Sequence, residues 1–157
     1  MLRQFGDMYT LLLRELRILL DTPNVYYKEN GFLPGFHIFS SSFYFQFPVA
    51  SFHTDGQQHQ NDWSDNCDLN QSLSFTLSID LPKNSSGLYI FDATNKQSRL
   101  QALFSNRSFI PYKIGKIVLH HGNNWHIMAP SKIKTNEYRM TLQGHGIKCQ
   151  NSWFIYW

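Results

Sequence analysis

A chain of 157 residues with 42% hydrophobic and 16% aromatic residues can bury a core of its own, so we expect one folded domain over residues 1–157. The net charge of +3 comes from scattered Lys and Arg residues, which argues against a nucleic-acid partner. No apolar run reaches the roughly 18 residues that a transmembrane helix needs, so no membrane partner is expected either.

The chain begins with an amphipathic segment. Apolar residues recur at three- and four-residue steps over its first turns, among them Leu12, Leu16 and Leu19. Pro23 ends the pattern, because the residue before a proline avoids the helical region of backbone space. We therefore predict a helix within residues 1–22 that packs on a sheet and supports it.

Short apolar segments separated by Gly, Pro and Asn turns make up the rest of the chain. The expected strands cover 36–40, 43–47, a segment that carries His53, 73–81, 88–92, 108–113, 116–121, 125–129, 137–145 and 152–156. The polar residues 56–71 are expected to form a long loop. Because one helix cannot supply the crossovers of a parallel sheet, we predict an all-β jelly roll over about residues 35–157.

The segment 73–81 shows the clearest alternation of apolar and polar residues. Leu73 and Phe75 belong to its apolar face, while Ser74 and Thr76 belong to the polar one. The polar face could point inward beside a bound ligand or outward to solvent, and the pattern leaves both arrangements open.

Two cysteines, Cys67 and Cys149, lack the spacing of metal ligands. They could pair, but two free thiols in a reducing compartment are the simpler interpretation. Charged residues interrupt the early apolar positions, so the N-terminus does not resemble a signal peptide. We accordingly predict a cytoplasmic protein.

Three residues suggest a metal site. His53 and Asp55 are two positions apart, so they project to the same side of a strand. His126 begins a later apolar strand and offers a third ligand. Two imidazoles and a carboxylate on one face are typical of a facial Fe(II) site with open coordination positions. A single histidine on a strand is more often a hydrogen-bonded core residue, so the interpretation depends on all three residues together.

The segment 138–145 carries a second set of polar residues. Arg139, Thr141, Gln143 and His145 share one face of the expected strand. A guanidinium inside a barrel is costly unless it meets an anion, and it binds a carboxylate through two hydrogen bonds. We therefore interpret Arg139 and Thr141 as a clamp for one end of a dicarboxylate, with a solvent-facing Arg139 as the alternative.

Together these segments resemble the Fe(II)/2-oxoglutarate-dependent dioxygenases. The residues that carry the resemblance are His53-Thr-Asp55, SLSFTLSIDLPKNSSGLYIFD from 72 to 92, YKIGKIVLHHGNNWHIMAP from 112 to 130, and YRMTLQGH from 138 to 145. The resemblance covers most of the chain from about residue 35 onward. It implies a double-stranded β-helix, the fold of that family.

The resemblance also implies a set of roles. His53, Asp55 and His126 would hold iron, and 2-oxoglutarate would chelate that iron with its far carboxylate on Arg139 and Thr141. His120 and His121 compete with His126, but they lie farther before Arg139 than is usual in the family and fit better in the preceding strand.

The activity that the resemblance implies is hydroxylation of a small molecule, amino acid or peptide, with release of succinate and carbon dioxide. Ascorbate is a further candidate cofactor. Asp55 favours hydroxylation over halogenation, because the family's halogenases have a small residue there. The chain is short for the family, so its substrate pocket could be open or completed by a partner subunit, and the oligomeric state is left open.

Two alternatives remain. A cupin-like metal enzyme without 2-oxoglutarate would leave Arg139 unexplained. A non-catalytic β-barrel that binds a sugar or a protein would have no need for three intact metal ligands. Among the other residues, Trp63 could line a substrate pocket or attach its loop to the barrel. Tyr44 is a candidate hydroxyl near the cosubstrate. His37 is expected to be structural.

Overall fold

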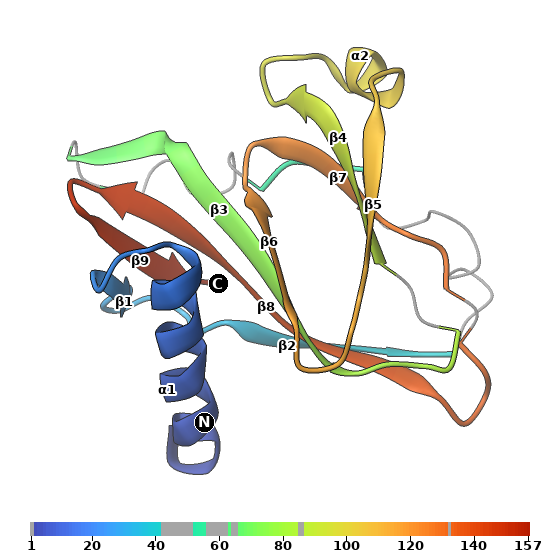
Figure 1. Cartoon of the computed structure of the whole chain (residues 1–157), viewed down its shortest axis with the longest axis horizontal. Coiled ribbons are helices and arrows are strands. Elements are labelled where there is room, and N and C mark those ends of the chain that lie inside the picture. The colour runs from blue at the N-terminus through green and yellow to red at the C-terminus, as the bar shows by residue number, and fades with distance from the viewer. Residues whose placement is uncertain (1, 42–51, 56–62, 64–65, 85–86, 132) are drawn as a thin grey trace.

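The computed structural model describes residues 2–41, 52–55, 63, 66–84, 87–131 and 133–157 (Figure 1). Its helices are α1 (Leu2–Leu19) and α2 (Arg99–Leu103). Its strands are β1 (Val25–Tyr27), β2 (Gly35–Ser40), β3 (Cys67–Asp80), β4 (Gly87–Thr94), β5 (Arg107–Pro111), β6 (Ile117–His121), β7 (Asn124–Met128), β8 (Tyr138–Cys149) and β9 (Ser152–Tyr156). Strands dominate, as the sequence pattern predicts.

The strands form two sheets. The larger sheet has the order β1-β9-β8-β3-β6, and β2 pairs with the first half of β8. The smaller sheet has the order β5-β4-β7. Every pairing between these strands is antiparallel except that of β1 with β9. The long strand β8 is central, because it contacts β2 and β9 along one edge and β3 along the other.

Helix α1 covers the outer, apolar face of the larger sheet (Figure 1). Its buried residues Tyr9, Leu12 and Leu16 pack with Leu73 and Phe75 of β3. The Tyr9 hydroxyl donates a hydrogen bond of 2.8 Å to the backbone oxygen of Pro34, which ties the helix to the start of β2. The supporting helix expected within 1–22 is thereby confirmed.

The opposite face of β3 points toward the smaller sheet. Ser74, Thr76 and Ser78 are all buried, and Ser74 and Thr76 line a pocket between the two sheets. This result decides the question that the sequence left open: the polar face of β3 lies inside the fold, not in solvent.

Helix α2 and strand β1 were not anticipated from the sequence. Ser98 begins α2 with a capping box, in which its hydroxyl accepts from the backbone N–H of Gln101. The buried Ala102 then packs with Phe52 and Phe91 against the smaller sheet. The Ser-x-x-Gln pattern is a recognised start signal and could have revealed this helix.

The cysteine interpretation was wrong. Strand β3 begins at Cys67, inside the run of residues 56–71 that we expected to be a loop, and its register with β8 sets Cys67 opposite Cys149. The two residues form a disulfide across the strands, with their Cα atoms 3.9 Å apart. Strand pairing brings together two thiols that are 82 positions apart in the sequence.

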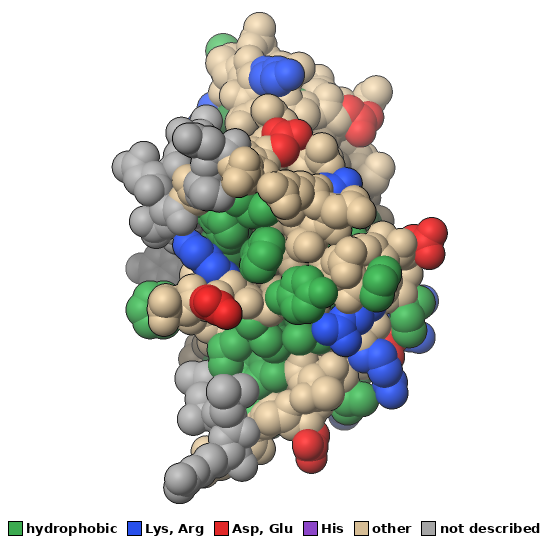
Figure 2. All heavy atoms as spheres, turned by 90° about the vertical axis from the view of Figure 1, so that its left-hand side faces the viewer, with side chains coloured by type: hydrophobic (Ala, Val, Ile, Leu, Met, Phe, Trp, Pro, Cys, Tyr) green, Lys and Arg blue, Asp and Glu red, His purple; other side chains and the backbone are tan. Residues whose placement is uncertain are grey.

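The surface over α1 and β1 retains apolar side chains. The large hydrophobic residues of these two elements that are exposed are Phe5, Leu11, Ile18, Leu19 and Tyr26. Figure 2 views the molecule from this side and shows hydrophobic side chains gathered there, with Lys and Arg side chains nearby. Neither described helix has the combination of length and apolar character required to cross a bilayer.

Candidate metal centre and its pocket

Backbone pairing brings the three expected metal ligands together. His53 forms an isolated antiparallel bridge with His126 of β7, with N···O distances of 3.2 and 3.0 Å. The Asp55 N–H then donates to the Gly122 oxygen at 2.8 Å, at the turn between β6 and β7. A side chain at Gly122 would meet the Ser72 hydroxyl at 2.8 Å, so glycine permits the close approach of this turn to β3.

The side chains of these residues converge on one point. Nε2 of His53 lies 3.2 Å from Oδ1 of Asp55, and Nε2 of His126 lies 3.4 Å from Oδ2. One ligand atom from each of the three residues can be chosen so that all lie within 4.8 Å of one another. Two imidazole nitrogens and a carboxylate oxygen at this spacing fit a single metal ion.

The hydrogen bonding of His126 also suits a metal ligand. Its Nδ1 lies 3.0 Å from the backbone oxygen of Asn124, which can only accept, so Nδ1 carries the proton. Nε2 is then the nitrogen with a lone pair, and it is the atom that faces Asp55. A ligating histidine is commonly oriented in this way through its second nitrogen.

Asp55 and His126 have the protonation states that a metal ligand needs. Burial alone would raise the pKa of Asp55, but its hydrogen bond from His53 and the nearby imidazoles His126 and His145 outweigh burial and hold that pKa well below its usual range. Burial lowers the pKa of His126. At neutral pH the carboxylate is therefore ionised and His126 neutral, which are the forms that bind metals.

Further polar residues surround Asp55. Ser74 Oγ and His145 Nδ1 lie 3.1 Å apart, and His145 Nδ1 lies 3.8 Å from Asp55 Oδ2. The ring of His120 is 4.6 Å from that of His126. Burial, followed by the charge of His126, lowers the pKa of His120 to about 4. His121 is exposed, so of the two competing histidines only His120 borders the centre.

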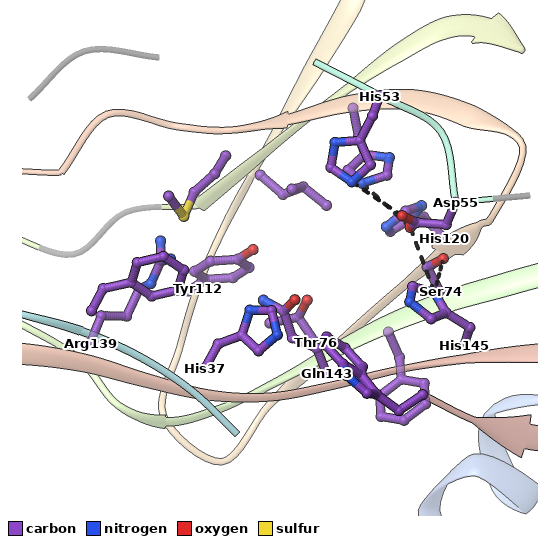
Figure 3. A pocket seen from close by; sticks show the side chains of 16 residues that line it. His37, His53, Asp55, Ser74, Thr76, Tyr112, His120, Arg139, Gln143 and His145 are labelled. Atoms are coloured by element: carbon purple, nitrogen blue, oxygen red, sulfur yellow. Dashed lines mark hydrogen bonds and ion pairs between the residues drawn. The ribbon is translucent and has the colours of Figure 1, made fainter. Parts of the chain in front are cut away.

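The metal centre opens into a pocket of about 540 Å³ between the two sheets. Figure 3 shows His53 and Asp55 on one side of this pocket and Arg139 with Tyr112 on the other. Arg139 is only 1% exposed, and its guanidinium lies 4.1 Å from the ring centre of Phe39. Burial lowers the pKa of Arg139 to about 10, so it remains a cation at neutral pH.

The structure rejects the solvent-facing alternative for Arg139. Arg139 lines the pocket. Thr141 is fully buried and is not among the residues that line the pocket. Thr141 Oγ1 accepts a hydrogen bond of 3.3 Å from the Gln143 amide, and Gln143 and His145 both line the pocket.

Several pocket residues were missed or given another role. His37, which we expected to be only structural, lines the pocket, and so do Phe39 and Trp157. Strand β2 sets His37 opposite Thr141, a pairing that the sequence pattern does not reveal. Trp63 instead packs against Tyr156 with ring centres 5.2 Å apart, away from the pocket, and the expected strand 43–47 with Tyr44 lies outside the described residues.

Comparisons with known proteins bear on the fold of the chain. No protein-family model and no curated protein matches the sequence. Among solved structures, the chain is similar to an N-substituted L-amino acid dioxygenase from Burkholderia ambifaria AMMD, with a TM-score of 0.60 and 13% identity over 79% of this chain and 53% of that chain. It is also similar to an N-substituted L-amino acid dioxygenase from the same organism in complex with alpha-ketoglutarate, with a TM-score of 0.56 and 13% identity over 79% and 52% of the two chains.

At this level of identity the likeness establishes the fold. The chain shares the fold of these N-substituted L-amino acid dioxygenase structures. It spans about half the length of the solved structures that it matches.

Proposed function

We propose that this chain is an Fe(II)/2-oxoglutarate-dependent oxygenase that hydroxylates a small molecule, an amino acid or a peptide. The observation that carries the proposal is one pocket with His53, Asp55 and His126 on one side and the buried cation Arg139 on the other. A dicarboxylate between them would ligate a metal at one end and neutralise a guanidinium at the other.

In this proposal, His53, Asp55 and His126 hold Fe(II), and Arg139 binds the far carboxylate of 2-oxoglutarate. Thr141, buried next to the pocket on the same strand, supports that carboxylate. Iron with its cosubstrate would supply the activation of dioxygen, with succinate and carbon dioxide as products and ascorbate as a candidate reductant. The remaining pocket residues exclude water and orient the substrate.

The strand order supports a double-stranded β-helix. One four-strand half is β2-β8-β3-β6, and the other is the His53 segment followed by β7-β4-β5. Consecutive strands alternate between the two halves at several points, as in a jelly roll. We propose that this barrel and the helix α1 together form the single domain 1–157.

Anaerobic addition of Fe(II) and 2-oxoglutarate tests the proposal directly. The weak visible charge-transfer band of the chelate should appear with the unmodified protein. It should disappear in Arg139→Ala and persist in Arg107→Ala, which removes an exposed arginine of β5. A folded protein without any band would contradict the proposal, and metal binding without succinate formation would favour the cupin-like alternative.

The compartment needs a separate test. Disulfides persist mainly in oxidising compartments, so the bond between Cys67 and Cys149 argues against the cytoplasmic location predicted from the sequence. Thiol labelling of the protein in freshly lysed cells, with and without prior reduction, measures its native redox state. Full labelling without reduction would restore the cytoplasmic prediction.

A further inference from the structure

We propose that Ser74 and His145 act as positioning residues that engage one oxygen of Asp55, so that this carboxylate binds the metal through its other oxygen. The proposal rests on the metal role of Asp55 in the proposed function. It assigns a task to two pocket residues that neither ligate the metal nor contact Arg139 in that function.

The strand register brings the two residues together. Ser74 of β3 and His145 of β8 are direct partners in the antiparallel pair, so their side chains point to the same side of the sheet. Ser74 Oγ lies 3.1 Å from His145 Nδ1, which lies 3.8 Å from Oδ2 of Asp55. A hydrogen bond from Ser74 is also among the causes that lower the pKa of Asp55. Figure 3 shows the three side chains in contact at the edge of the metal centre.

The direction of these hydrogen bonds follows from the chemistry of the groups. A carboxylate that ligates a metal is ionised and can only accept, so the Ser74 hydroxyl must donate its one proton to Asp55. Ser74 Oγ can then only accept from His145, which requires the proton of that imidazole on Nδ1. The three groups form a chain with one consistent direction, from His145 through Ser74 to Asp55.

Packing holds the imidazole of His145 in place. Its ring stacks on Trp157, with ring centres 5.6 Å apart and planes 20° apart, and Tyr156 lies on another side at 5.7 Å. Trp157 in turn lies against the backbone of Gly35, where an added Cβ would approach the indole to 3.2 Å. A donor fixed by its neighbours orients a ligand at lower entropic cost than a mobile one.

The consequence concerns the number of open positions on the metal. A carboxylate can bind a metal through one oxygen or through both. An oxygen of Asp55 that accepts from Ser74 is less available to the metal, which favours binding through the other oxygen alone. Two histidines and a one-oxygen carboxylate leave three positions of an octahedron open, whereas a two-oxygen carboxylate would leave two.

Cobalt binding to the metal-free protein tests the proposal without reference to turnover. Co(II) affinity is measured by competition with a chelator, and the visible d–d spectrum reports the coordination. We expect Ser74→Ala and His145→Phe each to weaken Co(II) binding by about 10- to 100-fold and to alter the spectrum. Because the two residues act through one chain, the double variant should resemble the single variants instead of combining their losses.

Two control variants separate positioning from general damage. Ser78→Ala makes the same change at a buried serine on the same face of β3, and it should leave Co(II) affinity and spectrum unchanged. His145→Asn keeps a donor near the position of Nδ1 and should recover part of the affinity, even though it loses the stack on Trp157. His145→Asn also provides the test of His145 if His145→Phe fails to fold.

The outcomes distinguish this proposal from the proposed function. Wild-type affinity and spectrum in folded Ser74→Ala and His145 variants, or losses that multiply in the double variant, would overturn the positioning role alone. The proposed metal site, and this inference with it, would be overturned if the unmodified protein bound no Co(II). The same holds if a His126→Ala variant bound Co(II) as tightly as the unmodified protein.

Discussion

His37 and Arg139 are two basic residues of the pocket, and the positive charge of Arg139 disfavours protonation of His37. Burial lowers the pKa of His37, and the positive charge of Arg139 lowers it further. His37 is therefore neutral at pH 7. Its ring is held edge-on against Trp157, with ring centres 4.7 Å apart, so it cannot easily move away when the charge of its surroundings changes.

This arrangement predicts a pH dependence for dicarboxylate binding. A carboxylate on Arg139 would offset the positive charge that depresses the pKa of His37, so that pKa should be higher in the complex than in the free protein. A group whose pKa rises on binding takes up protons, and 2-oxoglutarate should therefore bind more tightly as the pH falls through the pKa of His37 in the complex. Calorimetry of anaerobic, metal-loaded protein in buffers of different ionisation enthalpy measures the uptake.

The matched variant is His37→Gln, which keeps a polar side chain that cannot titrate. Its complex should form with less proton uptake and with a flatter dependence of affinity on pH. Equal uptake in His37→Gln and in the unmodified protein would assign the proton to another group and contradict the prediction.

At the residue scale, sequence patterns were most informative where a residue's chemistry is unusual for its position. Two histidines and an aspartate that fit one metal, and an arginine on a barrel strand, could all be chosen without coordinates. His37 and Trp157 could not, because an imidazole and an indole are common in ordinary cores. The place of His37 in the pocket depends on the pairing of β2 with β8, which the sequence does not specify. Trp157 follows β9, whose pairing with β8 is likewise not specified by the sequence.

At the scale of elements, the disulfide joins two strands that carry five polar pocket residues, which are Ser74, Thr76, Arg139, Gln143 and His145. Cys67 lies at the start of β3 and Cys149 at the end of β8, so the bond closes the outer end of this pair. Cross-linking residues that far apart in sequence restricts the unfolded chain far more than the folded one.

Reduction should therefore lower the stability of the protein. We expect a loss of about 2–4 kcal/mol in the free energy of unfolding, measured by denaturant titration with and without a reductant. A Cys67→Ser/Cys149→Ser double variant should start at the lower stability and should not respond to the reductant. A reductant effect of equal size in the double variant would show that the disulfide is not its cause.

The same strand pair shows why the elements were easier to predict than their ends. The alternation of 73–81 located the second half of β3, where one face packs on α1 and the other lines the pocket. Its first residues, from Cys67 on, are polar and mostly exposed, and their pairing with β8 includes an irregularity between Asp68 and Ser72. Without a buried face no periodicity marks them, so they resemble a loop in the sequence.

At the scale of the whole molecule, the metal centre lies where the described segment 52–55 meets both sheets. The described segment 52–55 is attached to β7 and to the β6–β7 turn through backbone contacts, and Asp55 is attached to β3 and β8 through Ser74 and His145. An ion bound by His53, Asp55 and His126 would link both sheets at this point.

Metal binding should accordingly stabilise the fold. An ion that binds only the folded state adds about 2.7 kcal/mol at a concentration 100-fold above its dissociation constant. We expect denaturant titrations to show this gain with Co(II) and its loss on adding a chelator. In His126→Ala this gain in the free energy of unfolding should be absent, because only His53 and Asp55, on one short segment, remain as ligands. An undiminished gain in that variant would place the stabilising ion elsewhere and would separate the stability of the fold from the proposed metal centre.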